Sequence, residues 1–218
     1  MAVKRKASWL PRSPIHPHLQ PTFDCRPQAR AEGNGGTQCV CQLRSLASNG
    51  IDKPVLNVLR MFSRMGRQRL AVERNAALWL DAITRQGVRE KPEVSALASR
   101  EANQLSVLVW HYHDDDVPGP DAAVMLTLGG LPFASGDARL QHFRIDQEHS
   151  NAFSVWQRMG SPQSPTPEQY VTLEKAGQLA ALGPSETLRV EKRHGFIGVY
   201  PSAPGVSLLL LEWARSPR

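Results

Sequence analysis

The segment with most potential for chemistry is WHYHDDD, residues 110–116. On a β-strand, His111 and His113 point to the same side, and the aspartates Asp114 to Asp116 follow directly. A His-x-His pair with a carboxylate is a legitimate beginning for a metal site. The alternative is a hydrated hairpin loop beside strand-end histidines, because VPGP follows at once and aspartate stabilises such turns. No third ligand stands nearby in the sequence, so we favour the loop and predict no metal and no cofactor.

Two further groups of polar residues resemble catalytic sites. Asp146 and Glu148 would share one face of an extended strand, with carboxylates roughly 6 to 7 Å apart. A catalytic pair needs a cleft and one carboxyl whose pKa is raised by burial, whereas we expect this pair to be hydrated. His149 and Ser150 are adjacent in the chain and cannot converge as base and nucleophile, and no G-x-S-x-G segment is present. We therefore predict no catalytic residue in this chain.

The segment HSNAFSVWQRMGSPQSPTPEQY, residues 149–170, is interpreted as a structural bracket. Phe153, Trp156 and Met159 recur at the spacing of one helix face, which favours packing against a core over binding a ligand. The residues SPQSPTP end this helix, and Thr166 is placed to cap the next one. The pattern predicts helices over residues 151–159 and 167–181.

Short β-branched or apolar runs predict about seven strands, which favours a mainly β fold, an antiparallel β-sandwich with a few short helices. In the run that contains Phe143, the odd positions are expected to face inward. The runs span residues 69–73, 94–100, 104–112, 122–128, 139–146, 186–192 and 206–213.

One helix of about three turns is predicted before these strands, from Lys53 to Met65. Asp52 is the expected N-cap, Pro54 lies in the first turn, and Gly66 supplies the end. Its apolar residues fall on one wide face, formed by Val55, Val58, Leu59 and Phe62.

The first 44 residues are expected to be irregular, because prolines recur and a GNGG run follows without any apolar period. They hold seven Lys or Arg and two Asp or Glu, a net +5, which leaves 19 against 18, or +1, for the remaining residues. Scattered arginines of this kind predict no nucleic-acid partner. No apolar run predicts a membrane span or a signal peptide, so a cytoplasmic location is expected. The three cysteines are odd in number, which argues against a disulfide scaffold, and Cys39 and Cys41 are interpreted as incidental thiols.

Four segments together resemble the C-terminal part of glycoside hydrolase family 39, the family of β-xylosidases and α-L-iduronidases. They are NGIDKPVLNVLRMF, the stretch from LSVLVWHYHDDD to GGLP, the stretch from LQHFRID to EKAGQL, and GVSLLLLEW, in order over residues 45–213. The resemblance implies an orphan helix of the type that closes a (β/α)8 barrel in residues 45–66, followed by an accessory β-sandwich in residues 67–218. The two catalytic glutamates of the family belong to barrel strands that have no counterpart here.

The resemblance therefore implies a fragment of a retaining xylan 1,4-β-xylosidase that is inactive alone, since the catalytic carboxylate pair is missing. The alternative is a stand-alone module that binds carbohydrate or docks on a barrel. A helix that normally faces a barrel would leave Val55, Leu59 and Phe62 exposed. Expected partners are accordingly a barrel-bearing chain, a second copy of this chain, or a xylo-sugar.

Overall fold

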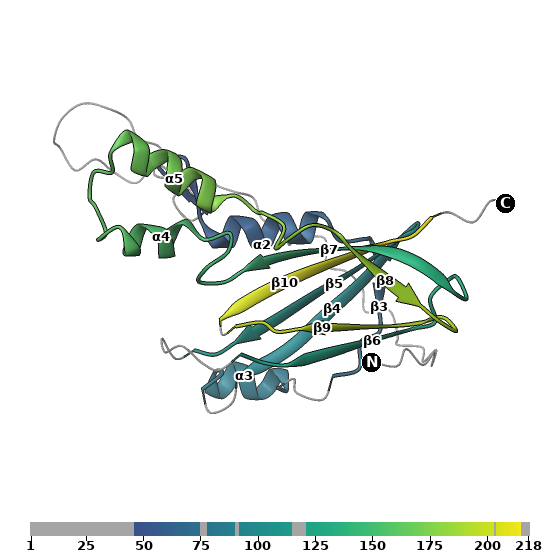
Figure 1. The fold of residues 1–218 in the computed structure, drawn as a ribbon. Coiled ribbons are helices and arrows are strands. Elements are labelled where there is room, and N and C mark those ends of the chain that lie inside the picture. The colour runs from purple at the N-terminus through teal and green to yellow at the C-terminus, as the bar shows by residue number, and fades with distance from the viewer. Residues whose placement is uncertain (1–45, 75–77, 90–91, 115–120, 203, 215–218) are drawn as a thin grey trace, which may run out of the picture.

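The computed structural model describes residues 46–74, 78–89, 92–114, 121–202 and 204–214. These residues form ten β-strands and four α-helices, arranged as a β-rich body with a helical hairpin that projects from one end (Figure 1). No closed barrel is present among them, and the mainly β, antiparallel fold expected from the sequence is confirmed. None of the helices in these ranges is long and apolar enough to cross a membrane.

The centre of the fold is one antiparallel sheet of six strands in the order β3-β4-β5-β10-β7-β8. The strand β5 pairs along its whole length with β4 on one side and β10 on the other. The bounds are β3 Gln68–Leu70, β4 Glu93–Glu101, β5 Gln104–Tyr112, β7 Gly136–Ile145, β8 Glu186–Val190 and β10 Gly205–Glu212.

One face of this sheet packs against a small second sheet, made of β6 (Val124–Gly129) and β9 (His194–Val199). Alternate residues of both layers form the main core between them, as in a sandwich. The buried members include Val107, Val109, Leu126, Ile197, Val199, Leu209 and Leu211. The strand β9 was not predicted.

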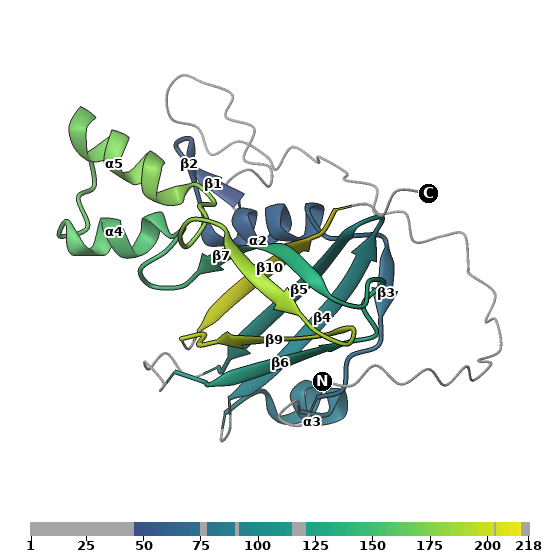
Figure 2. The ribbon, with the colours of Figure 1, turned by 45° about the vertical axis from the view of Figure 1, so that its right-hand side comes forward.

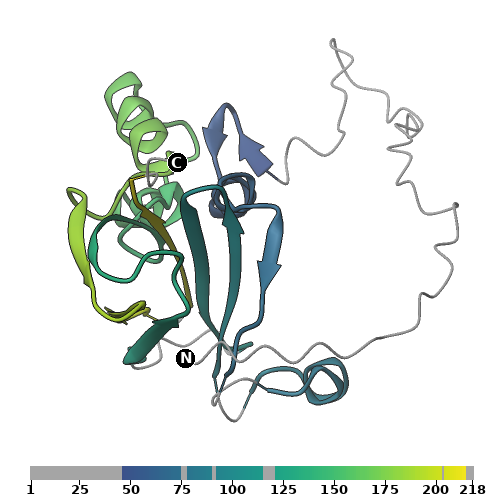
Figure 3. The ribbon, with the colours of Figure 1, turned by 90° about the vertical axis from the view of Figure 1, so that its right-hand side faces the viewer.

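The other face of the six-stranded sheet is covered by the helix α2, Pro54–Ser63 (Figure 3). Met61 is fully buried there, and Val58 and Met65 pack on the same second core with Phe143, Leu208 and Leu210. The prediction that Val58 shares one face with Leu59 and Phe62 is therefore wrong. Apolar residues lie on both sides of this helix, and only one of the two sides packs on the sheet.

Because both faces of the sheet are covered, the inward and outward assignment expected for β7 is only partly right. Phe143 and Ile145 are buried as predicted, but they lie in the core beneath α2. Leu140, which was expected to face solvent, is equally buried in the sandwich core. A strand covered twice cannot be read by simple alternation.

The start of α2 also differs from the prediction. Lys53 occupies the N-cap position, and its side chain makes no capping hydrogen bond. Asp52 instead lies in the hairpin of β1 (Ala47–Ser48) and β2 (Ile51–Asp52) and forms an ion pair with Arg60 at 2.6 Å. After the helix, Gly66 approaches β4 so closely that a Cβ would lie 2.4 Å from the carbonyl carbon of Arg100.

The projecting hairpin consists of α4 (Ala152–Arg158) and α5 (Pro167–Gly177), which lie beside each other beyond α2 (Figure 2). A fully buried side chain, Asn57, connects this hairpin to α2. Its Nδ2 donates hydrogen bonds to the backbone oxygens of Ser150, at 3.0 Å, and Gly177, at 2.7 Å. The fourth helix, α3 (Leu80–Gln86), was not predicted.

Candidate functional site

Only the first histidine of WHYHDDD contacts the backbone, whereas neither ring nitrogen of His113 has a hydrogen-bond partner among the described residues. His111 is buried, and its Nδ1 lies 3.1 Å from the carbonyl oxygen of Pro201. Asp114 accepts hydrogen bonds from the backbone of Val88, at 2.6 Å, and from the hydroxyl of Tyr112, at 2.8 Å. These two bonds, the Val88 bond foremost, lower the pKa of the Asp114 carboxyl.

No cluster of three or more potential metal ligands occurs within the residues that the structure describes. The loop of residues 115–120, on which the hydrated-loop prediction depends, lies outside them.

Asp146 and Glu148 occupy different environments. The side chain of Asp146 is buried, and its Oδ1 accepts hydrogen bonds from the backbone N–H groups of Glu148 and His149, both at 2.8 Å. Burial opposes ionisation of Asp146, but these bonds and the ring of His149, also at 2.8 Å, outweigh it and lower the pKa. Glu148 is exposed and pairs with Arg158 at 3.0 Å. The prediction that both carboxylates are hydrated is therefore wrong for Asp146, which organises a turn.

His149 and Ser150 contact separate groups and form no nucleophile and base pair. The ring of His149 faces Asp146, whereas the buried hydroxyl of Ser150 accepts a hydrogen bond from the backbone of Ala180 at 3.2 Å. Ser150 has a positive φ of 52°, which lets the chain turn from β7 into α4. The backbone oxygen of Ser150 accepts the hydrogen bond from Asn57 described above, so this turn belongs to the contact between α2 and the helical hairpin.

The helical hairpin confirms the structural interpretation of residues 149–170, with one correction. Thr166 caps α5 in a reciprocal capping box with Gln169, and the indole N–H of Trp156 donates to the carbonyl of Pro162 at 3.0 Å. Phe153, expected in a core, is instead 55% exposed. It lies beside Trp156 with ring centroids 5.7 Å apart.

His142 is a titratable side chain that the sequence did not single out. Its Nε2 has no hydrogen-bond partner among the described residues. Burial, followed by the positive charges of Arg144 and His149, lowers the pKa of His142 to about 4. This imidazole is therefore neutral at pH 7.

Two surface features remain as candidates for function. The first is the outer face of α2, formed by Val55, Leu59 and Phe62, whose exposed fractions are 47, 50 and 46%. This exposure agrees with the expectation from the sequence. An apolar strip on a helix that already buries its other side is typical of an interaction surface.

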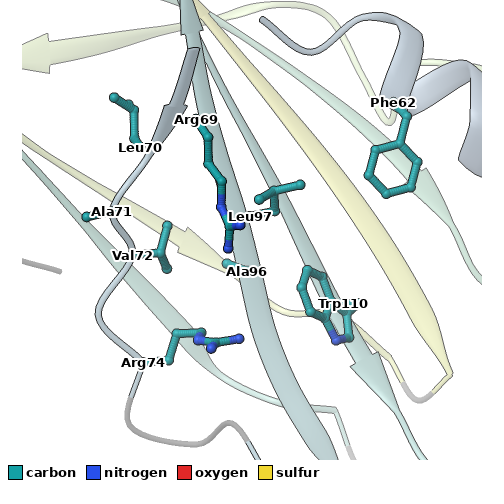
Figure 4. A pocket seen from close by; sticks show the side chains of 9 residues that line it. All are labelled: Phe62, Arg69, Leu70, Ala71, Val72, Arg74, Ala96, Leu97 and Trp110. Atoms are coloured by element: carbon teal, nitrogen blue, oxygen red, sulfur yellow. The ribbon is translucent and has the colours of Figure 1, made fainter. Parts of the chain in front are cut away.

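The second feature is a groove of about 480 Å³ between α2 and the edge strand β3, referred to below as the α2–β3 groove (Figure 4). Trp110 and Leu97 come from the central sheet, and Phe62 lies on α2. The side chains of Arg69 and Arg74 extend along the edge-strand side. The full lining is Phe62, Arg69, Leu70, Ala71, Val72, Arg74, Ala96, Leu97 and Trp110.

Two polar contacts hold one end of the groove. Arg74 Nη1 donates to Ser95 Oγ at 2.6 Å, and the indole N–H of Trp110 donates to Glu93 Oε2 at 3.3 Å. Ser95 and Trp110 are cross-strand partners, so both contacts depend on the pairing of β4 with β5. Sequence reasoning did not identify this groove.

The family model described as glycosyl hydrolases family 39 matches residues 16–187. The chain belongs to this family. The match confirms the resemblance, although it begins before residue 45 and ends before residue 213.

Solved structures agree with this assignment. The GH39 enzyme from Xanthomonas axonopodis pv. citri is 20% identical, with a TM-score of 0.59, and the alignment covers 75% of this chain and 31% of that one. A monomeric β-xylosidase from Caulobacter crescentus CB15 is 17% identical, with a TM-score of 0.56 and coverage of 76% and 31%. A bacterial orthologue of human α-L-iduronidase is 18% identical, with a TM-score of 0.55 and coverage of 77% and 28%.

At these identities the structural likeness establishes a shared fold and nothing finer. This chain spans less than a third of the length of each of these three proteins. The part that it shares with them is the β-rich body with its helices.

Proposed function

We propose that this chain supplies the accessory β-rich part of a family 39 β-xylosidase and does not hydrolyse xylosides alone. The observation that carries this proposal is coverage: three quarters of the chain corresponds to less than a third of the Xanthomonas enzyme. Retaining hydrolysis needs two carboxyl groups about 5 to 5.5 Å apart across the scissile bond. Asp146 and Glu148, the pair suggested by spacing, are instead engaged with His149 and Arg158.

The outer face of α2 is the proposed contact with a barrel-bearing catalytic chain. Val55, Leu59 and Phe62 are each about half exposed, whereas the inner residues Val58 and Met61 pack on the sheet. Removal of such an apolar strip from water by a partner favours formation of the complex. A second copy of this chain is the other partner that would satisfy the same surface.

Activity on an aryl β-xyloside tests the first part of the proposal. We expect no turnover by the purified chain. Turnover that survives repurification and disappears in Asp146→Asn or Glu148→Gln would overturn it.

Docking is tested by co-purification with a separately expressed family 39 barrel polypeptide. We expect Val55→Glu to abolish it and Val171→Glu to leave it intact, because Val171 is an exposed valine on a different helix, α5. Equal loss in both variants, or retention in both, would contradict docking through α2. Gel filtration of the chain alone distinguishes self-association.

A specific observation also favours the second candidate, a module that binds xylo-sugars. Met125, Phe196 and Tyr200 lie on the strands β6 and β9 or just after them, and each is at least 60% exposed. Gly198 lies between the two aromatic residues in the sequence, and a Cβ there would lie 3.7 Å from the ring of Tyr200. Aromatic surfaces of this kind suit the apolar face of a sugar ring. Titration with xylotetraose should perturb the aromatic NMR signals, and Tyr200→Ala should remove that response. An unchanged spectrum would exclude this candidate.

A further inference from the structure

We propose that the α2–β3 groove binds a pyranose that carries a carboxylate, such as a uronate unit of a glycan. The inference depends on family membership and on the groove itself. Phe62 belongs both to the groove and to the outer face of α2, so the variants below leave Phe62 unchanged. The groove's volume of about 480 Å³ lies within the range of roughly 300 to 1,000 Å³ that is usual for small-molecule sites.

The apolar floor of the groove is fixed before a ligand arrives. Trp110 is half-buried on the central strand β5, and its hydrogen bond to Glu93 at 3.3 Å restrains the indole. Leu97, on the neighbouring strand β4, extends the same surface. The C–H face of a pyranose can pack on such an indole, and a restrained ring loses little entropy when it does.

The charge of the groove determines which sugar it favours. Its lining contains two arginines and no acidic residue. Arg74 is anchored by Ser95 at 2.6 Å, and Arg69 has no hydrogen-bond or ion-pair partner among the described residues. A guanidinium binds a carboxylate in a planar, two-point geometry that a neutral sugar cannot reproduce. Binding of neutral sugars should therefore be weaker.

The choice of a sugar acid over an acidic peptide follows from two observations. The chain belongs to a family of glycosyl hydrolases, whose substrates are glycosides. The groove also places an indole beside the cationic groups (Figure 4), which suits a ring with one apolar face and one charged edge. An acidic peptide would use the arginines but would not need Trp110.

Two matched ligands test the proposal on the full-length chain. Methyl β-D-glucuronide and methyl β-D-glucoside differ only at C6, where the glucuronide has a carboxylate in place of a hydroxymethyl group. Each is titrated while the indole N–H signal of Trp110 is followed by NMR. The signal is assigned from its loss in Trp110→Phe. We expect the glucuronide to shift this signal and to bind about tenfold tighter than the glucoside, a ratio that corresponds to one good charge-assisted contact.

The variants decide whether the arginines cause the preference. Arg69→Gln/Arg74→Gln should remove it, whereas Arg67→Gln should retain it, because Arg67 is 92% exposed and faces Glu101. A dispersed NMR spectrum confirms that each variant is folded. The proposal is refuted by no shift at Trp110, by equal binding of both sugars, or by a preference that survives the double substitution. A tetraglutamate peptide that reproduces the same shift at Trp110 would also refute it, since any polyanion would then suffice.

Discussion

The substitution Asn57→Ala tests whether one side chain holds the helical hairpin to the body of the protein. Asn57 is fully buried and donates to the carbonyls of Ser150 and Gly177, at 3.0 and 2.7 Å. Each carbonyl left without a donor costs about 1 to 1.5 kcal/mol, and the vacated space adds a smaller cost. We therefore expect the free energy of unfolding to fall by about 2 to 4 kcal/mol, a large part of the roughly 5 to 15 kcal/mol that is usual for a domain.

Urea unfolding followed by circular dichroism measures this loss. With a slope of about 2 kcal/mol per molar urea, the midpoint should fall by about 1 to 2 M. Val55→Ala is the matched control, because Val55 lies on the exposed side of the same helix, and it should change stability by less than about 1 kcal/mol. An Asn57→Ala variant no less stable than this control would refute the assigned role of Asn57.

Four further changes have defined outcomes. The low pKa of His142, about 4, lies below its unfolded value, so protonation favours unfolding and acidification from pH 7 to 5 should lower stability by on the order of 1 kcal/mol. Urea unfolding of His142→Phe should lack this slope. The pKa of the Asp146 carboxyl is lowered in the folded state, so its charge stabilises the fold above the unfolded pKa, and this contribution is lost on further acidification. In Asp146→Asn the melting temperature should therefore depend less on pH below about pH 4. Gly66→Ala, whose Cβ would meet the β4 backbone at 2.4 Å, should cost about 1 to 3 kcal/mol in calorimetry. Thr166→Ala removes the capping box of α5 and should cost about 1 kcal/mol, with faster amide exchange in the first turn.

Local signals in the sequence predicted much of the fold. The expected strand over residues 104–112 coincides with β5, and Thr166 caps α5 as its position indicated. The strand β9 was missed because Gly195 and Gly198 weaken a pattern that otherwise alternates. Asp52 has the residue type of a helix cap, but tertiary contact with Arg60 places it in a hairpin.

The candidate sites were harder to predict because strand pairing creates them. Arg69 and Arg74 look like hydrated surface charges in the sequence. They line the same groove as Trp110 because β3 pairs with β4 and β4 pairs with β5. The buried state of Asp146 likewise depends on a turn whose backbone N–H groups point back at its own carboxylate. Neither arrangement produces a periodic pattern of residues in the sequence from which it could be predicted.

The two-sided character of α2 has a consequence for anyone who divides a family 39 enzyme into parts. A shortened version that starts at β3 would lack Met61, which packs in the same buried cluster as Leu208. The apolar face of the sheet beneath α2 would then be exposed to water. A version that keeps α2 would carry its outer strip into solvent instead. The second version is easier to correct, because the half-exposed residues of α2 can be replaced by polar ones. The buried residues of the sheet cannot be replaced in this way without loss of the core.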